Sequence, residues 1–281
     1  MGLHHIKAIE VMGFAELVGV ADPFIQEATI AESLPAGTRF FSDPAAMLSA
    51  LKPDVVHIVT PPDTHVAVAM LALEYAAHIY VEKPFALTSA DALKILDYAA
   101  EKKLKVCAGH QVVFQHAGQT YRKYLPIIRE IVHIESYFSF KTVRRVGGGL
   151  MGPVEQLADI LPHPVYLMLD AFEASGKGDR SQPCEITAVD VDAAGEVRAL
   201  IKHGSVPAQL TVTLRGRPIE SYLRIVGSNG SLWIDFVISG VARFLGPGVS
   251  AISAVLNPFI RAKQITFGTL ANVYRMLTRK H

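Results

Sequence analysis

Short β-branched runs alternate with helix-period segments between residues 16 and 109, and this alternation constrains the fold more than any other feature. We expect strands at residues 16–21, 38–41, 54–59, 78–81 and 105–108. Helices are expected between them at 43–51, 64–77 and 89–103, where the Thr64 and Ser89 hydroxyls can cap the first turns. Strands that alternate with helices predict βαβ units in a doubly wound, Rossmann-like parallel sheet of the α/β class.

The pattern changes after residue 117 to longer strand-like runs at 131–141, 185–192, 196–203, 208–214 and 221–226. The turn Gly227-Ser-Asn-Gly230 predicts a hairpin with residues 231–235, because Gly and Asn tolerate positive φ. One helix is expected over 153–173. A chain of 281 residues is long enough for two domains. We therefore predict a Rossmann-like domain over 1–114 and an α+β domain with a mainly antiparallel open sheet over 115–281.

Charge and composition narrow the class of partner. A net charge of +1 gives no global basic field, so nucleic-acid binding is not expected. Cys107 and Cys184 lie far apart without metal or redox spacing, which favours free thiols and a cytoplasmic location. The first residues lack the apolar region of a secretory signal, and Gly, Pro and Arg interrupt the apolar stretch 236–260, so no transmembrane helix is expected.

The tripeptide Glu82-Lys83-Pro84 closes the strand expected at 78–81. The carboxyl ends of parallel strands are where open α/β sheets bind ligands. Glu82 and the fixed φ of Pro84 would restrict how the Lys83 ammonium points. Lys83 is therefore a candidate catalytic residue, the alternative being a solvated lysine at a strand end.

Two other expected strands also end in candidate ligand-binding residues. Asp22 follows the strand at 16–21, where a carboxylate can bind both ribose hydroxyls of an adenosine; the alternative is an Asp that starts a turn before Pro23. Thr60-Pro61-Pro62 follows the strand at 54–59 and leads to His65 in the next helix. Two prolines in succession force an extended bend, which suits a backbone that lies against a ligand.

In the second half, Asp159 and His163 are four residues apart, which places them on one face of the expected helix. A carboxylate can orient an imidazole there, and a histidine that titrates near neutral pH can accept a proton. The alternative is a pair on the helix surface. The other histidines, including His4, His5, His57, His110 and His203, have no metal-ligand spacing, so no metal site is expected.

Together these motifs resemble the Gfo/Idh/MocA family of glucose-fructose oxidoreductase and inositol dehydrogenase relatives, in order and spacing over most of the chain. The motifs that carry the resemblance are Ala21-Asp22-Pro23, Thr60-Pro61-Pro62 with His65, Glu82-Lys83-Pro84, Gly147-Gly148-Gly149 and Asp159-x-x-x-His163. The chain departs from the family pattern at Val113, often an arginine, and at Leu161, usually a small residue.

The resemblance implies a bound NAD, with NADP less expected, and hydride transfer to or from a CH–OH carbon of a sugar, sugar nucleotide or polyol. It implies that Lys83, Asp159 and His163 hold and deprotonate the substrate hydroxyl. Gly2 and His5 lie in a segment similar to the end of the family's glycine signature. We therefore expect an amino-truncated Rossmann sheet whose missing first strand leaves 16–21 and 54–59 either apart or collapsed together.

Other interpretations remain open at this point. A non-catalytic nucleotide-binding or sugar-binding regulatory protein of the same fold, or an inactive truncated product, would explain the missing glycines. The resemblance implies a homodimer or homotetramer through the open sheet face. After Asp235 the chain has no acidic residue but has several Arg and Lys, so this tail can bind the surface of an anionic membrane; the alternative is a tail that packs on its own domains or on a dimer partner.

Overall fold

The computed structural model describes residues 1–143, 151–174, 184–246 and 250–278. By its internal contacts the chain divides into two compact units, Met1–Gly109 and His110–His281. The predicted boundary after residue 114 coincides with the end of a short helix, α6 (Gln111–Phe114), in the second unit. Each unit has a hydrophobic core of its own.

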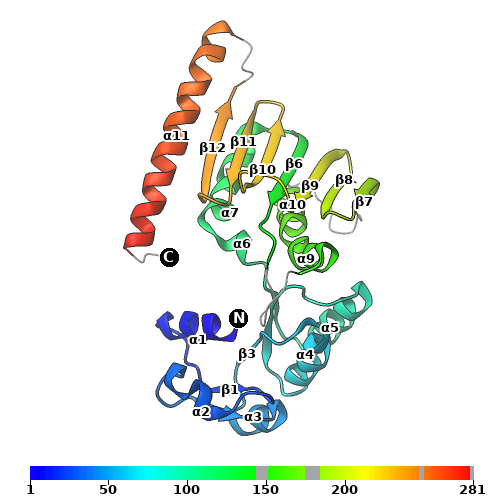
Figure 1. Cartoon of the computed structure of the whole chain (residues 1–281), viewed down its shortest axis with the longest axis vertical. Coiled ribbons are helices and arrows are strands. Elements are labelled where there is room, and N and C mark those ends of the chain that lie inside the picture. The colour runs from blue at the N-terminus through cyan, green and yellow to red at the C-terminus, as the bar shows by residue number, and fades with distance from the viewer. Residues whose placement is uncertain (144–150, 175–183, 247–249, 279–281) are drawn as a thin grey trace. The chain divides into compact units, whose positions relative to one another are not determined.

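The first unit alternates strands and helices as predicted (Figure 1). Its strands are β1 (Gly19–Ala21), β2 (Arg39–Phe41), β3 (Val55–Ile58), β4 (His78–Val81) and β5 (Val106–Ala108). Its α-helices are α1 (Gly2–Val11), α2 (Glu27–Ile30), α3 (Pro44–Leu51), α4 (His65–Glu74) and α5 (Ser89–Glu101), and short 3-10 turns occupy Ala31–Ser33 and Pro62–Thr64.

All strand pairs in this unit are parallel, but they form two separate sheets. One sheet pairs β1 with β2, and the other has the order β3-β4-β5. β1 and β3 therefore do not pair, which is one of the two arrangements expected for residues 16–21 and 54–59. The β3-β4-β5 sheet buries its apolar side chains, among them Ile58, Ile79 and Val81, against α4 and α5.

Helix starts in the first unit are set by local hydrogen bonds, and two predicted caps are wrong. The side chain of Asp43 caps α3 by accepting from Ala45 N and Ala46 N. α5 is capped by Thr88, whose Oγ1 accepts from Asp91 N at 3.1 Å, rather than by Ser89. Thr64 makes no side-chain cap to α4, because its hydroxyl donates instead to Pro61 O at 2.7 Å.

The second unit is built on one seven-stranded sheet of order β12-β11-β10-β6-β9-β8-β7. Its strands are β6 (Ile131–Ser139), β7 (Glu185–Val191), β8 (Glu196–His203), β9 (Val206–Thr213), β10 (Ser221–Gly227), β11 (Gly230–Asp235) and β12 (Gly240–Leu245). All its pairs are antiparallel except β6 with β9, which is parallel. The β10–β11 hairpin confirms the predicted turn, and Gly230 at its end has a φ of +142°.

Helices cover one face of this sheet. They are α6 (Gln111–Phe114), α7 (His116–Thr120), α8 (Leu125–Ile128), α9 (Pro153–Ile160) and α10 (Pro162–Ala174), with a 3-10 turn at Tyr121–Tyr124. Tyr121, Leu167 and Met168 pack from this helical layer against strand residues such as Leu223 and Ile225 in the larger core. A last helix, α11 (Ala251–Leu277), runs along β12 at the edge of the sheet (Figure 1).

One expectation for this unit needs correction. The helix expected over 153–173 is two helices that meet at Leu161, because Pro162 and Pro164 have no backbone N–H to continue the ladder. In the stretch 236–260, β12 ends at Leu245 and α11 begins at Ala251 and continues through Pro258. Within the described residues, no helix is both long and apolar enough to span a membrane.

Candidate functional site

In the first unit the carboxyl ends of β3, β4 and β5 carry Thr60, the Glu82–Lys83 pair and Gly109. Backbone hydrogen bonds join these ends, from Glu82 N to Ile58 O at 2.9 Å and from Gly109 N to Val81 O at 2.7 Å. Gly109 lies so close to the lysine segment that a Cβ there would be 3.0 Å from Glu82 Cα. The Thr60 and Glu82–Lys83 segments therefore follow neighbouring strands at one edge of the sheet.

Glu82 fixes the start of the Lys83 segment. Its side chain is buried, and its Oε2 accepts a hydrogen bond from Lys83 N at 3.2 Å. Its Oε1 accepts from Tyr80 Oη at 3.4 Å and from His5 Nε2 at 3.0 Å. Lys83 itself is half-buried directly after this anchored carboxylate.

A cluster of four polar side chains, His5, His57, Tyr80 and Glu82, links α1 to β3 and β4. His5 Nδ1 lies 3.0 Å from His57 Nδ1, and the His57 and Tyr80 rings, opposite each other in the parallel register, stack at 4.9 Å. When His5 Nε2–H donates to Glu82, His5 Nδ1 can accept a hydrogen bond from His57 Nδ1–H. Both hydrogen bonds can therefore form while the two histidine rings are neutral. α1 thereby begins beside the end of β3, where a Cβ on Gly2 would lie 3.9 Å from Val59.

This environment shifts the pKa values of two side chains in the cluster, His57 and Tyr80. Burial, together with the neighbouring His5, lowers the pKa of His57 below 6.5, and Glu82 opposes the shift in part. Burial and the Glu82 carboxylate raise the pKa of the Tyr80 hydroxyl to about 12. Tyr80 therefore stays a neutral hydrogen-bond donor to Glu82 near neutral pH.

The lowered pKa of His57 predicts that the first unit loses stability as the pH falls through 6.5. In that range His57 takes up a proton in the unfolded chain but not in the folded one, so unfolding binds protons and is favoured by acid. Hydrogen exchange of β4, followed by mass spectrometry at about pH 7.5 and about pH 5.5, should show weaker protection at the lower pH. His57→Gln should reduce this difference, whereas His4→Gln, on the exposed side of α1, should leave it unchanged.

His65 holds two loops of this edge together. The side chain is fully buried, with Nδ1 2.9 Å from Pro84 O and Nε2 2.9 Å from Thr60 O. A ring N–H can donate to either carbonyl, and to both at once in the imidazolium form. His65 therefore ties the segment after β3 to the segment after β4, and its side chain serves the backbone rather than facing a ligand.

The remaining predicted residues of this unit take turn conformations. Asp22 follows β1, in the other small sheet, and its Oδ1 accepts from Phe24 N at 2.8 Å and Ile25 N at 3.2 Å. This is the turn role that was the alternative for Asp22, and a ribose contact remains a prediction. Pro61 is extended with a φ of −58° and a ψ of 144°, and Pro62 starts the 3-10 turn that leads into α4.

In the second unit Asp159 lies in the last turn of α9 and His163 in the first turn of α10. His163 Nδ1 is 2.8 Å from Tyr166 Oη, which also accepts from Val112 N at 3.4 Å. The buried Tyr166 ring stacks on His110 at 4.3 Å, and burial lowers the pKa of His110. Tyr166 therefore fixes the orientation of the His163 ring through Nδ1.

Gln156 anchors the segment that precedes the glycine motif. The side chain is buried on α9, where Oε1 accepts from Val143 N at 3.1 Å and Nε2 donates to Lys141 O at 2.5 Å. Gly147-Gly148-Gly149 lies outside the described residues. Among the described residues, no group of three or more His, Cys, Asp and Glu side chains could hold a metal ion.

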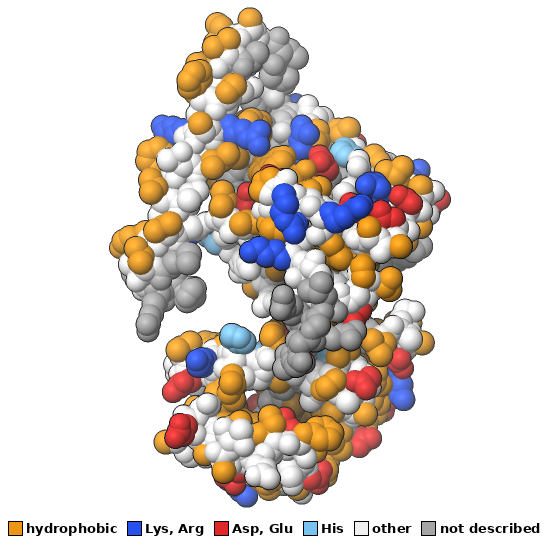
Figure 2. Space-filling view, in the orientation of Figure 1, with side chains coloured by type: hydrophobic (Ala, Val, Ile, Leu, Met, Phe, Trp, Pro, Cys, Tyr) orange, Lys and Arg blue, Asp and Glu red, His pale blue; other side chains and the backbone are white. Residues whose placement is uncertain are grey.

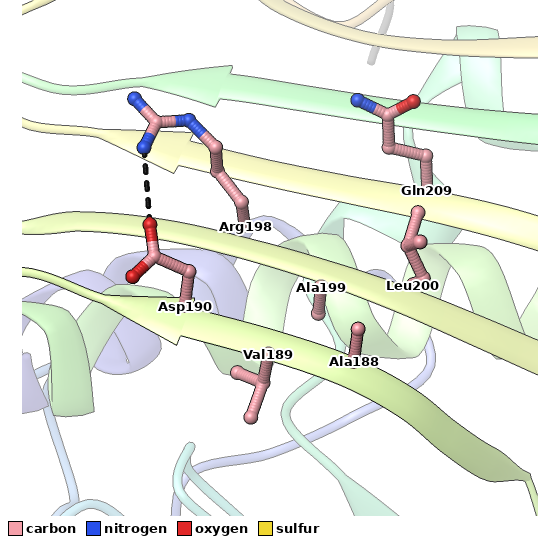
Figure 3. A pocket seen from close by; sticks show the side chains of 7 residues that line it. All are labelled: Ala188, Val189, Asp190, Arg198, Ala199, Leu200 and Gln209. Carbon is pink, nitrogen blue, oxygen red and sulfur yellow. Dashed lines mark hydrogen bonds and ion pairs between the residues drawn. The ribbon is translucent and has the colours of Figure 1, made fainter.

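The open face of the large sheet carries a shallow hollow across β7, β8 and β9 (Figure 3). The paired residues Ala188 and Leu200 lie on this face, and the Arg198–Asp190 ion pair, with N and O 3.3 Å apart, lies at one end. Its lining contains none of the predicted site residues. An exposed apolar sheet face of this kind suits contact with another protein surface.

Sequence reasoning missed four residues that shape these sites: His57, Tyr80, His110 and Tyr166. His57 and His110 were set aside as scattered histidines, because their spacing matches no metal motif. The parallel register that pairs His57 with Tyr80 could have been inferred by aligning the two expected strands. The stacking of Tyr166 on His110 depends on contacts between α6 and α10, which no local pattern encodes.

Comparisons with known proteins identify relatives of the first unit. Residues 1–110 match the model of the Gfo/Idh/MocA family, described as an oxidoreductase family with an NAD-binding Rossmann fold. A UDP-N-acetylglucosamine 3-dehydrogenase of Acidithiobacillus ferrooxidans is 31% identical over 110 residues, 39% of this chain and 35% of that protein. A D-glucoside 3-dehydrogenase of Escherichia coli is 38% identical over 93 residues, 33% of this chain and 26% of that protein. The matches thus span about a third or less of these curated relatives.

Solved structures share the fold of both units. A crystal structure of the Acidithiobacillus ferrooxidans UDP-N-acetylglucosamine 3-dehydrogenase has a TM-score of 0.69 and 22% identity, and the alignment covers 98% of this chain and 92% of that one. An oxidoreductase structure from Magnetospirillum magnetotacticum has the same TM-score and identity, over 91% of this chain and 86% of that one. The succession of helices and strands in both units is therefore a fold that these solved structures share.

Proposed function

Because this chain belongs, through residues 1–110, to the Gfo/Idh/MocA family of oxidoreductases with an NAD-binding Rossmann fold, we propose that it is an NAD-dependent dehydrogenase. The proposed reaction moves a hydride between nicotinamide and a CH–OH carbon of a sugar or sugar nucleotide. Two curated relatives are named 3-dehydrogenases of sugar compounds, and a third is a D-apiose dehydrogenase. These names point to a hydroxyl on a sugar ring as the reacting group.

The observation that carries the proposal is the Lys83 segment at the carboxyl end of β4. Ligands bind at this end of parallel strands, and Glu82 fixes the backbone of Lys83 there through a hydrogen bond from its N–H. α1 supports cofactor binding at the same edge. Its first turn has neither an acidic residue nor a side-chain cap, so its N–H groups can receive a phosphate.

In the proposed reaction the bound nicotinamide supplies the carbon that accepts the hydride. His163 takes the proton of the substrate hydroxyl on Nε2, while Tyr166 holds its Nδ1. Asp159 favours the imidazolium that results. Lys83 donates a hydrogen bond to the hydroxyl oxygen and stabilises the alkoxide charge that develops as the proton leaves. Lys83 belongs to the first unit and His163 to the second.

A cofactor and substrate panel tests this proposal. The protein is incubated with NAD or NADP and with UDP-N-acetylglucosamine, methyl glucosides and pentoses, and formation of reduced cofactor is followed by absorbance. We expect turnover with at least one sugar and a preference for NAD, because the Asp22 carboxylate would repel a 2′-phosphate. The Asp22→Ala variant lacks this carboxylate, so its preference for NAD over NADP should be smaller.

A non-catalytic sugar-binding or nucleotide-binding protein is the second candidate. It is favoured by Asp22, whose carboxylate is already engaged in a turn, and by the separation of the two small parallel sheets. Such a protein would bind NAD or a sugar in calorimetry and form no reduced cofactor with any member of the panel.

We also propose a cytoplasmic location and a homodimer or homotetramer. Cys107 and Cys184 are free thiols, and Cys107 is exposed, which suits a reducing compartment. The open sheet face around β7, where every residue is exposed, offers an apolar surface for a partner subunit. Light scattering of the purified protein gives the number of subunits directly.

A further inference from the structure

α11 packs on its own unit through polar side chains. Gln264 bonds to both backbone groups of Arg243, accepting from N at 2.7 Å and donating to O at 3.0 Å. Asn272 donates to Ser239 O at 3.0 Å, and the Arg261 guanidinium lies 5.0 Å from the centre of the Trp233 ring. The side of the helix that faces the sheet is therefore its polar side.

The outward side of α11 is apolar, the reverse of an ordinary surface helix. Orange side chains line the length of this helix in Figure 2. Its most exposed members include Ile252 at 72%, Phe259 at 71% and Leu277 at 79%. Exposed apolar area on this scale marks a surface that binds a partner.

The spacing of the outward residues is that of a coiled-coil seam, alternating four and three residues. The apolar seam positions are Ile252, Leu256, Phe259, Leu270, Val273 and Leu277. Lys263 and Thr266 occupy the two central positions. A helix of 27 residues is about 40 Å long, so the seam extends along nearly its whole length.

The seam is self-complementary when two copies run antiparallel. About its midpoint, Ile252 falls opposite Leu277, Leu256 opposite Val273 and Phe259 opposite Leu270. Lys263 then falls opposite Thr266 of the other copy. In a parallel pair each position would meet its own copy, so Lys263 would face Lys263 in an apolar seam, and the sequence of α11 has no acidic residue to compensate.

We propose that two copies of this chain associate through α11 in this antiparallel register. The contact is isologous, since each helix contributes the same surface, and it therefore closes as a dimer. It is separate from the open sheet face and does not depend on the enzymatic function. Each copy contributes six apolar seam side chains, and Phe267 and Tyr274 beside them are 61% and 65% exposed. The surface that these side chains bury in the dimer can approach the roughly 800 Å² that each partner buries in a stable interface.

The charges of α11 favour a second copy over an anionic membrane. Arg261 lies over Trp233, and Arg275 bonds to Asn272 on the inner side, so among the described basic residues of the helix only Lys263 belongs to the outward seam. A single lysine contributes only about 1 kcal/mol of attraction to an anionic surface. The apolar seam, rather than charge, therefore dominates any association.

Site-directed cross-linking tests the register. In a Cys107→Ser, Cys184→Ser background, Leu256→Cys together with Val273→Cys should form a covalent dimer on mild oxidation. Neither cysteine alone should do so, nor should the mismatched pair Leu256→Cys with Leu277→Cys, which is one helical turn out of register. A covalent dimer from Leu256→Cys alone would indicate parallel pairing and would overturn the proposal.

Light scattering on a variant with an altered seam gives an independent test. Phe259→Lys with Leu270→Lys should weaken association roughly a hundredfold and halve the mass of the assembly, while unchanged Trp233 fluorescence shows that α11 remains docked. An unchanged mass would overturn the proposal. So would a monomeric protein that co-sediments with vesicles of phosphatidylcholine and phosphatidylglycerol through the same side chains. Both readouts are independent of dehydrogenase activity, so they separate this proposal from the proposed function.

Discussion

Replacing His163 with alanine is expected to lower turnover by roughly 10²-fold to 10⁴-fold, because the variant loses the group that accepts the hydroxyl proton. Lys83→Ala should cause a loss of similar size, since it removes the cation that stabilises the developing alkoxide. Initial rates with the best sugar of the panel measure both effects.

Two milder variants distinguish catalysis from folding. Asp159→Asn keeps the size of the side chain and should reduce turnover less than His163→Ala. Tyr166→Phe keeps the ring stacked on His110 but removes the hydroxyl 2.8 Å from His163 Nδ1, so it should lower turnover more than it raises the Michaelis constant. Near-normal turnover by both His163→Ala and Lys83→Ala would show that neither residue takes part in the reaction.

Replacing His65 with alanine is expected to destabilise the first unit by about 2–4 kcal/mol. The variant leaves the Thr60 and Pro84 carbonyls without their 2.9 Å partner and opens a cavity at a fully buried position. Because these carbonyls belong to the two loops at the proposed cofactor edge, NAD affinity should fall as well. Hydrogen exchange of β4 measures the stability, and calorimetric titration with NAD measures the affinity.

The two-unit structure supplies internal controls for this variant. Trp233, the only tryptophan in the chain, is in the second unit, so its fluorescence transition in urea should not change. His4→Ala changes an exposed histidine of the same unit and should alter neither exchange nor affinity. Unchanged exchange of β4 in His65→Ala would mean that the buried imidazole does not hold these loops.

Strand ends were the most predictable part of the candidate site. Short β-branched runs followed by turn-forming residues located the ends of β1, β3 and β4 within one residue. The buried partners that orient those residues were not predictable. Tyr80 and His57 act on Glu82 only because β3 and β4 align them, which is a property of register rather than of either run.

The end of the chain was the least predictable part of the fold. Gly240, Pro247 and Pro258 interrupt the apolar stretch 236–260, and Gly and Pro usually terminate or kink a helix. The structure instead uses the segment for β12 and for the start of α11, whose docking through Gln264 and Asn272 holds the helix despite Pro258. Local propensity was overridden by contacts with strand residues more than 20 positions away.

Transfer of the hydride itself is the most direct test of the central claim. The sugar that is turned over in the panel is prepared with deuterium on the carbinol carbon, and the reduced cofactor is analysed by mass spectrometry. With the unaltered protein, we predict that the deuterium appears on nicotinamide C4 of NADH. With His163→Ala, the same labelled NADH should form at a much lower rate. Binding of NAD and sugar with no deuterium in the cofactor would contradict the claim and would identify the protein as a binding protein with a dehydrogenase fold.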